Sequence, residues 1–504
     1  MPTVKELLKD LELGNSVAEF DDQLESYFVE TQPFRELVRD RKDIVAGDKG
    51  TGKTAIFKVL HKRYHLIPEL KNVIVLPAFN TIGNPIFQQL TESGPLNENE
   101  YIHLWKAFFI SLAGNWVLKH NRIRPKTNLA KLEQLLIGLE LRSENDTPHH
   151  VFSKIIGKIG RLFHWKSAEF KIETSPEGGM SFVPKVEFGE NKEENESHIS
   201  IESALQLLNT CLSEVGKSVW IAVDRLDEAF QGHNDIEIPA LRALFRSYLD
   251  LLAFERIKLK LFVRRDLFSR IVSGGFVNLT HVNAKKVEVI WDEEDLLSLL
   301  CKRVKKNAAF TKAVANGNFA DKQIFYRIFP NQVDPGSRKP ETWVWMLGRI
   351  KDGNGIRPPR NLIDLVSMAK DAQLRREDRD PREFDKTKAM IETDALRRGL
   401  ALLSEQRVND TLLAEAGSQA PLIEKFRRGK AEHNDQSLSE LLGIFPGAIR
   451  DYIKPLIELG FLEEVGGTYK IPMLYRGGLE ITQGKAFEDK SSDAEDEENT
   501  LSEA

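Results

Sequence analysis

Eight consecutive residues carry the strongest chemical signal in this sequence. Gly47-Asp48-Lys49-Gly50-Thr51-Gly52-Lys53-Thr54 matches the pattern G-x-x-x-x-G-K-[ST]. Glycines let backbone N–H groups turn toward phosphate oxygens, and a helix that begins near Lys53 would point its partial positive end at the same anion. Lys53 would reach the β- and γ-phosphates, and the Thr54 hydroxyl would ligate Mg²⁺. The pattern therefore predicts a nucleoside triphosphate site with ATP and Mg²⁺; the alternative is a glycine-rich turn without a ligand.

A site of this kind needs a carboxylate at the end of a neighbouring strand. The apolar run Val219–Val223 ends in Asp224, and Asp227 and Glu228 follow closely. Asp224 would hold Mg²⁺ directly or through water, while Glu228 or Asp227 would orient the attacking water. Spacing does not choose between those two acids. The alternative is an acidic loop behind a buried strand.

Two arginines follow a further predicted strand, Leu259–Val263. In a parallel nucleotide-binding sheet the carboxyl ends of the strands face the ligand. Arg264 or Arg265 would then sense the γ-phosphate. The alternative is that one of them forms a salt bridge with Asp224 or Asp227.

A third arginine stands where a cation is unfavourable. In Arg357-Pro358-Pro359-Arg360 the prolines place Arg360 in the first turn of a helix, near the positive end of its dipole. This placement predicts an anionic partner, with nucleotide phosphate as the candidate. The alternative is a surface arginine near a carboxylate.

Strands and helices that alternate along the chain would position these groups. Strand patterns cover residues 43–46, 72–76, 218–223 and 257–263, and helical patterns cover 55–60, 98–120, 201–215 and 241–252. This alternation predicts an α/β fold, a P-loop parallel sheet with flanking helices. Most of the aromatic residues of 98–120 are expected in the core, and a period of two over 170–188 predicts an inserted hairpin. Beyond about residue 290 helical patterns replace strands.

Five segments follow from these patterns. They are an N-terminal helical segment (1–40) expected to pack on the following domain, a P-loop core (41–290) with an insertion at about 78–200, a helical lid region (291–405), a winged-helix domain (420–485) and a disordered acidic tail (486–504). In the winged helix, residues 437–443 and 446–459 form two helices and 461–471 a hairpin. The second helix offers Arg450 and Lys454 but also Asp451 and Glu458, a weak footprint for DNA. The alternative is that this module packs on the core or binds a partner protein.

The phosphate loop, the strand that ends in D-x-x-D-E at Asp224–Glu228 and the arginine after the next strand resemble the STAND, KAP and wider AAA+ groups of P-loop ATPases. Arg357–Arg360 is similar to the sensor-2 region of AAA+ lids. Tyr27–Thr31 leading into Ile44–Gly47 resembles a bacterial P-loop ATPase family that often carries a C-terminal winged helix. The resemblance implies homo-oligomers and a bacterial role in DNA transactions or phage defence. Two departures are the wide gap between Gly47 and Asp224 and acids that are not contiguous.

Composition limits the class of protein. The chain has 504 residues and a net charge of -5; the last 17 residues carry -7, so the first 487 carry +2. No apolar run is long enough to cross a bilayer and no export signal is visible, and two cysteines cannot form a disulfide framework. We therefore expect a cytoplasmic, ATP-hydrolysing switch (ATP + H₂O to ADP + phosphate). The alternatives are a nucleotide-binding regulator or scaffold with little hydrolysis, and a DNA-binding protein controlled by ATP.

Overall fold

The structure, a computed structural model, describes residues 2–79, 96–121, 127–143, 147–156, 169–174, 180–185, 200–226, 234–273, 275–314 and 320–487. The chain divides into two compact units. The sheet unit comprises residues 30–49 and 53–289. The terminal unit comprises residues 1–29, 50–52 and 290–504, so it includes three residues of the phosphate loop.

A five-stranded sheet forms the centre of the sheet unit. Its strands are β1 (Ile44–Gly47), β2 (Val73–Phe79), β5 (Ser218–Val223), β6 (Ile257–Arg264) and β7 (Lys286–Glu288), in the order β2-β5-β6-β1-β7. All four neighbouring pairs are parallel. The predicted parallel sheet is confirmed. Strand β7 was not predicted, because only Val287 among its three residues is apolar and no strand pattern emerges.

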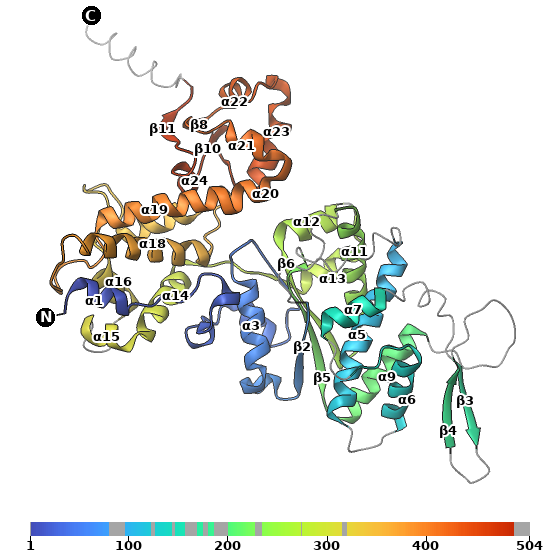
Figure 1. Ribbon diagram of the computed structural model, residues 1–504. Coiled ribbons are helices and arrows are strands. Elements are labelled where there is room, and N and C mark those ends of the chain that lie inside the picture. Colours follow the sequence, from blue (N-terminus) through green and yellow to red (C-terminus); the bar gives the residue numbers. More distant parts are fainter. Residues whose placement is uncertain are drawn as a thin grey trace, which may run out of the picture. The chain divides into compact units, whose positions relative to one another are not determined.

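Helices cover the sheet on both faces. They are α2 (Gln32–Val38), α3 (Lys53–Arg63), α5 (Glu98–His120), α6 (Thr127–Gly138), α7 (Pro148–Ile156), α9 (Ile201–Glu214), α11 (Asn234–Leu251), α12 (Arg265–Ser273) and α13 (Leu279–Ala284). Helix α3 lies on one side of the sheet, and α5 and α9 lie on the other (Figure 1). Side chains alternate across a strand, so Leu261 of β6 joins the core with α5, α9 and α11, whereas Phe262 meets Phe57 of α3 edge to face. This two-sided burial explains why the strands read as continuous apolar runs.

Helix α5 supplies the aromatic core that the sequence predicted. Trp105, Phe108 and Phe109 are fully buried. Trp105 and Phe108 pack against Phe152 of α7, and Phe109 stacks on Trp105. The Trp105 indole N–H donates to the carbonyl of Ala240 over 2.9 Å, so its polar edge is also satisfied. The inserted hairpin is present as well, with β3 (Glu169–Thr174) antiparallel to β4 (Met180–Lys185). The residues that join the two strands, 175–179, lie outside the described residues.

The terminal unit is mainly helical. Its elements before residue 420 are α1 (Val4–Asp10), α14 (Glu293–Lys306), α15 (Ala308–Val314), α16 (Asp321–Ile328), α17 (Thr342–Ile350), α18 (Pro359–Glu377), α19 (Thr393–Arg407), the π-helical turn η5 (Val408–Leu413) and α20 (Ala414–Ala416). One apolar core joins α1, α14, α18 and α19, with Leu8, Leu300, Leu362 and Leu396 all buried in it. This matches the helical character predicted for residues 291–405.

The N-terminal segment differs from the prediction. The segment predicted to be helical contains α1 and α2, but between them the chain forms only short 3-10 turns, at Ala18–Phe20 and Leu24–Ser26. Residues 1–29 also group with the terminal unit, and not with the sheet that follows them in sequence. The backbone N–H of Val4 donates to the Arg382 carbonyl, and that of Phe384 to the Pro2 carbonyl. Periodicity shows that a segment is amphipathic, but it does not show which core the apolar side enters.

The last part of the terminal unit contains α21 (Ala420–Glu424), β8 (Lys430–His433), α22 (Asp435–Leu442), α23 (Ile449–Glu458), β9 (Glu463–Val465), β10 (Thr468–Lys470), α24 (Met473–Arg476) and β11 (Thr482–Lys485). Two helices followed by the β9–β10 hairpin stand where the sequence predicted them. Strands β8 and β11 join the hairpin in a four-stranded sheet, β11-β8-β10-β9. Neither was predicted, because Ala431 is the only apolar residue in the two strands.

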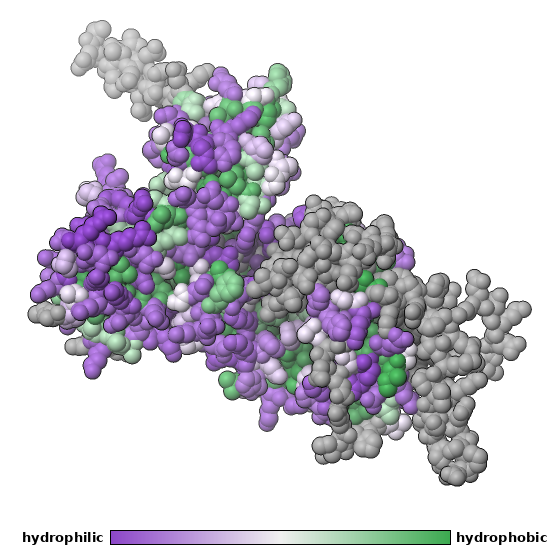
Figure 2. All heavy atoms as spheres, viewed as in Figure 1, coloured by the Kyte–Doolittle hydropathy of each residue, from purple (hydrophilic) through white to green (hydrophobic). Residues whose placement is uncertain are grey.

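The surface of the described residues mixes polar and apolar side chains (Figure 2). Within the same residues, no helix is both long enough and apolar enough to span a bilayer. The predicted acidic tail begins at 486, and residues 488–504 lie outside the described part of the chain.

Candidate nucleotide site

The glycine-rich loop leaves the buried strand β1 and enters helix α3. Gly50 and Gly52 have φ angles of +78° and +99°, a region that side-chain-bearing residues rarely adopt. Helix α3 begins at Lys53, so its first unpaired N–H groups follow directly on the loop. The sequence therefore builds locally what a phosphate needs, a turned backbone and the positive end of a helix dipole.

Lys53 lies across the start of the loop. Its ammonium donates to the carbonyl oxygens of Gly47, at 2.8 Å, and of Asp48, at 3.0 Å. The positive charge is thus held at the carboxyl end of β1 by the loop's own backbone. This is the charge that the motif predicted for contact with nucleotide phosphates.

Asp224 meets the loop from a different strand. It follows the end of β5, and strand β6 lies between β5 and β1 in the sheet. The carboxyl ends of parallel strands meet at one edge, so residues 170 positions apart become neighbours: the Thr54 side chain is hydrogen-bonded to Asp224. Two of the predicted metal-binding groups are therefore in contact.

Burial dominates the electrostatics of Asp224. The residue is 2% exposed, and burial raises its pKa to about 6, against the opposing effects of the Thr54 hydrogen bond and the Lys53 charge. Its second carboxylate oxygen, Oδ2, has no hydrogen-bond partner among the described residues. A buried, incompletely paired carboxylate beside a threonine hydroxyl is a suitable pair of oxygen ligands for a hard cation such as Mg²⁺.

The two acids predicted to orient water, Asp227 and Glu228, lie outside the described residues. The structure describes the chain up to Leu226, which is buried. Between Asp224 and Leu226, Arg225 adopts a φ of +57°. The chain therefore turns sharply as it leaves β5, and the choice between Asp227 and Glu228 stays a prediction.

The two arginines after β6 pair with other carboxylates. Arg264 makes a two-pronged contact with Asp266, at 3.0 and 3.1 Å. Arg265 lies 2.9 Å from Glu288 of β7 and 3.5 Å from Asp48 of the loop. Arg265 thus contacts the loop, and the described part of the chain contains no ion pair of either arginine with Asp224.

Arg360 differs from its neighbour Arg357. Arg357 pairs with Glu293 at 3.0 Å. Arg360 stands in the first turn of α18, as predicted, and forms no ion pair with a described carboxylate; its Nε is buried and has no hydrogen-bond partner there. A Cβ atom placed on Gly50 would lie 3.3 Å from the Cβ of Arg360. Within the terminal unit, Arg360 therefore lies against the glycine turn of the loop.

One contact to the loop was not predicted. The Trp291 indole N–H donates to the Thr51 carbonyl over 2.7 Å. The only sequence signal for this contact is a tryptophan beside the first helix after the sheet, which by itself predicts core packing. The contact uses a carbonyl of the loop and none of its backbone N–H groups.

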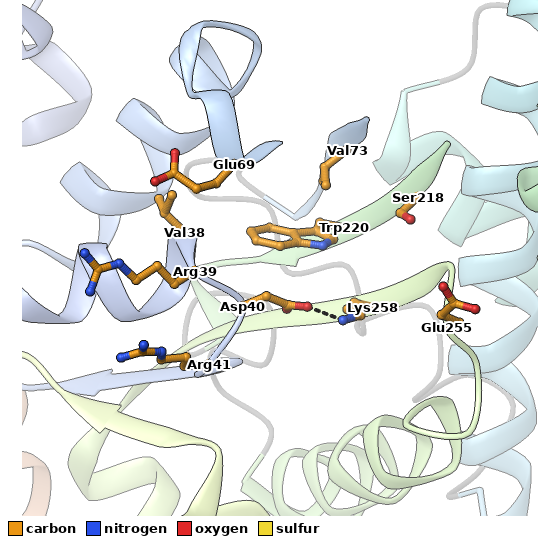
Figure 3. Close-up of a pocket in the computed structure, with 10 residues that line it drawn as sticks. All are labelled: Val38, Arg39, Asp40, Arg41, Glu69, Val73, Ser218, Trp220, Glu255 and Lys258. Carbon is orange, nitrogen blue, oxygen red and sulfur yellow. Dashed lines mark hydrogen bonds and ion pairs between the residues drawn. The ribbon is translucent and has the colours of Figure 1, made fainter. Parts of the chain in front are cut away.

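A cavity of about 420 Å³ opens at the opposite edge of the sheet, where β2, β5 and β6 begin (Figure 3). Trp220 and the ion pair between Asp40 and Lys258 lie in its wall. None of the predicted site residues lines it. Trp220 is only 2% exposed, so its ring offers little surface to a ligand.

Comparisons with known proteins give distant similarities. No protein-family model matches the chain. A curated Escherichia coli (strain K12) protein, named putative transposon gamma-delta 80.3 kDa protein, is 24% identical over 301 residues. The match covers 58% of this chain and 39% of that protein, so the chain spans less than half the length of this curated relative.

Solved structures with similar folds are also distant. The Walker-type ATPase PABY2304 of Pyrococcus abyssi is 13% identical with a TM-score of 0.40, over 94% of this chain and 100% of that one. The Aeropyrum pernix ORC2 protein, solved as ADPNP–ADP complexes, is 13% identical with a TM-score of 0.38, over 91% and 95%. The Aeropyrum pernix ORC1 protein in complex with DNA is 11% identical with a TM-score of 0.36, over 92% and 96%. The P-loop fold of this chain rests on its own strand order, loop and buried acid.

Proposed function

We propose that this chain binds ATP with Mg²⁺ and hydrolyses it, as a molecular switch. One observation carries the proposal: Thr54, at the start of α3, and Asp224, at the end of β5, are hydrogen-bonded beside the glycine-rich loop. The two residues come from distant parts of the chain, and a structural glycine turn has no need of a buried carboxylate whose Oδ2 lacks a partner.

Each group has a role in this proposal. The N–H groups of Gly50, Gly52 and the first turn of α3 would surround the phosphates, and Lys53 would add a positive charge. Thr54 and Asp224 would hold Mg²⁺, which when bound neutralises the charge of the phosphate oxygens. Arg360, beside Gly50, would contribute a further cation. Asp227 or Glu228 would orient the attacking water, as proposed from the sequence.

Turnover measurements test the proposal. ATP hydrolysis of the full chain is compared with that of Lys53→Ala, which removes the loop charge, and Glu228→Gln, which keeps the shape of the proposed water-orienting side chain. We expect Lys53→Ala to abolish ATP binding and turnover, and Glu228→Gln to keep binding while turnover falls about 100-fold or more. Equal turnover in all three proteins would exclude hydrolysis at this site.

The same measurement separates the proposed switch from a nucleotide-binding regulator with little hydrolysis. A regulator would bind ATP in a Lys53-dependent manner without measurable turnover. Contact with DNA stays a prediction from the sequence, since the structure adds no observation in its favour: Arg427 and Arg428 pair with Glu424 and Glu480, and Arg450 lies 3.4 Å from Asp435. Homo-oligomers, a partner protein and a role in phage defence likewise stay predictions from the resemblance.

A further inference from the structure

Arg360 lacks the partner that its own helix offers. Residues four apart lie on the same face of a helix, so Asp364 is the nearest carboxylate along α18 for the Arg360 guanidinium. Asp364 instead pairs with Arg407, the last residue of α19, and this contact is an ion pair with a hydrogen bond. The carboxylate that would neutralise Arg360 within its helix is thus occupied by a residue from another helix.

The pair of Arg407 and Asp364 is well shielded from water. The side chains are 8% and 16% exposed, so their attraction is little weakened by solvent. Burial and the nearby charge of Arg360 lower the pKa of Arg407, while Asp364 raises it. Arg407 and Arg360 are therefore close enough to repel one another, and Asp364 compensates only one of two neighbouring cations.

We infer that Arg407 is a positioning residue for the nucleotide site: by pairing with Asp364, it leaves the Arg360 guanidinium available for a nucleotide phosphate beside Gly50. The inference rests on the proposed function. It explains why an arginine stands unneutralised in the first turn of a helix, where the dipole opposes it. In this inference the packing of α19 on α18 has a function, because it brings Arg407 to Asp364.

Calorimetric titration of the full-length chain with Mg²⁺ and a non-hydrolysable ATP analogue tests the inference. We expect Arg360→Ala to weaken binding about tenfold, as the loss of one charge-assisted contact does. Arg407→Ala should weaken it about three- to tenfold, because Asp364 is then free to pair with Arg360. Adding Asp364→Asn to Arg407→Ala should return affinity to within about threefold of wild type, since no carboxylate then competes.

A double-variant comparison separates positioning from a general effect on the fold. In the Arg360→Ala background, Arg407→Ala should cause no further loss of affinity, because the residue through which it acts is gone. Equal losses in both backgrounds would overturn the inference. The inference would also be overturned if Arg407→Ala bound the analogue with wild-type affinity while Arg360→Ala bound it more weakly.

Two controls keep the inference distinct from the proposed function. If the wild type does not bind the analogue, or Lys53→Ala binds it equally well, the proposed function fails. If Lys53→Ala loses binding and Arg360→Ala does not, only the inference fails. Where Arg407→Ala alone does not fold, the variant with both Arg407→Ala and Asp364→Asn still decides, because affinity as weak as that of Arg360→Ala overturns the inference.

Discussion

Asp224 combines two properties that oppose each other. It is buried with one oxygen unpaired, which costs stability when the carboxyl is ionised, and it stands where a cation ligand is needed. Sites that bind metals or phosphates commonly retain such groups at a cost to the stability of the empty fold. The same atom that lowers stability would then provide affinity.

Asp224→Asn should therefore move stability and binding in opposite directions. The pKa of about 6 is above the ordinary value, so the ionised carboxyl destabilises the fold above pH 6 and this cost vanishes as pH falls to about 4. With a chelator present, we expect Asp224→Asn to raise the free energy of unfolding by about 1–3 kcal/mol at pH 8, by roughly half as much at pH 5, and by nearly nothing below about pH 4. Binding of the Mg²⁺–ATP analogue should weaken. Chemical denaturation at two pH values and calorimetry measure both, and a destabilised variant at pH 8 would contradict the argument.

At the residue scale, the sequence predicts which residues lie near one another where the signal is a continuous run of apolar residues. The loop and Asp224 could be predicted because each sits at the end of an apolar run, and parallel strands bring such ends together. Three contacts could not be predicted, because each joins residues from different elements. They are Arg407 with Asp364, Trp291 with the Thr51 carbonyl, and Arg265 with Asp48. An arginine at the end of an amphipathic helix is ordinary until its partner is known.

At the scale of elements, strand β6 also makes contacts that its sequence pattern does not predict. Its apolar run was predicted as a buried strand, but Lys260 within it is fully buried as well. The ammonium lies 2.5 Å from Asp43 and 2.7 Å from Asp40, and 4.0 Å from the centre of the Trp220 ring. Tyr248 of α11 donates to the second oxygen of Asp43 at 3.1 Å. This network ties β6 and α11 to the chain that enters β1, and so supports the strand that carries the phosphate loop.

A matched pair of lysines tests this support. Lys260→Met should cost about 3–5 kcal/mol, because it removes a fully buried ammonium from the Asp43 carboxylate, whose side chain is only 6% exposed. Lys258→Met, two residues away and paired with Asp40 from a side chain that is 35% exposed, should cost less than about 1 kcal/mol. Hydrogen exchange of the β1 and β6 amides measures the difference. Equal losses of protection in the two variants would show that the burial of Lys260 does not increase its contribution to stability.

At the scale of the whole molecule, the terminal unit is built from residues that precede the sheet unit in sequence and from residues that follow it. Residues 1–29 bring Leu7 and Leu8 of α1 into the core of α14 and α18. They also bring Asp21, which pairs with Arg303 of α14 at 3.0 Å, with both side chains at most 5% exposed. The sequence order, in which these residues precede the P-loop strand, suggested the opposite assignment. The N-terminal segment is therefore part of the fold of residues 290–487, and a fragment that begins at residue 290 would lack part of its own core.

Leu8→Ala tests this organisation in the full chain. The side chain is fully buried, and its truncation leaves a cavity that we expect to cost about 2–5 kcal/mol. Hydrogen exchange should become faster in α14, α18 and α19, which lie hundreds of residues away in sequence, and stay unchanged in β5 and in β1, which is the nearest of these elements to Leu8 in sequence. Phe57→Ala is the matched control, because its ring is buried against Phe262 in the sheet unit and should produce the reverse pattern. If Leu8→Ala instead reduced protection in the sheet strands and left α14 and α18 unaffected, residues 1–29 would belong to the sheet unit. The expected pattern would support their assignment to the terminal unit.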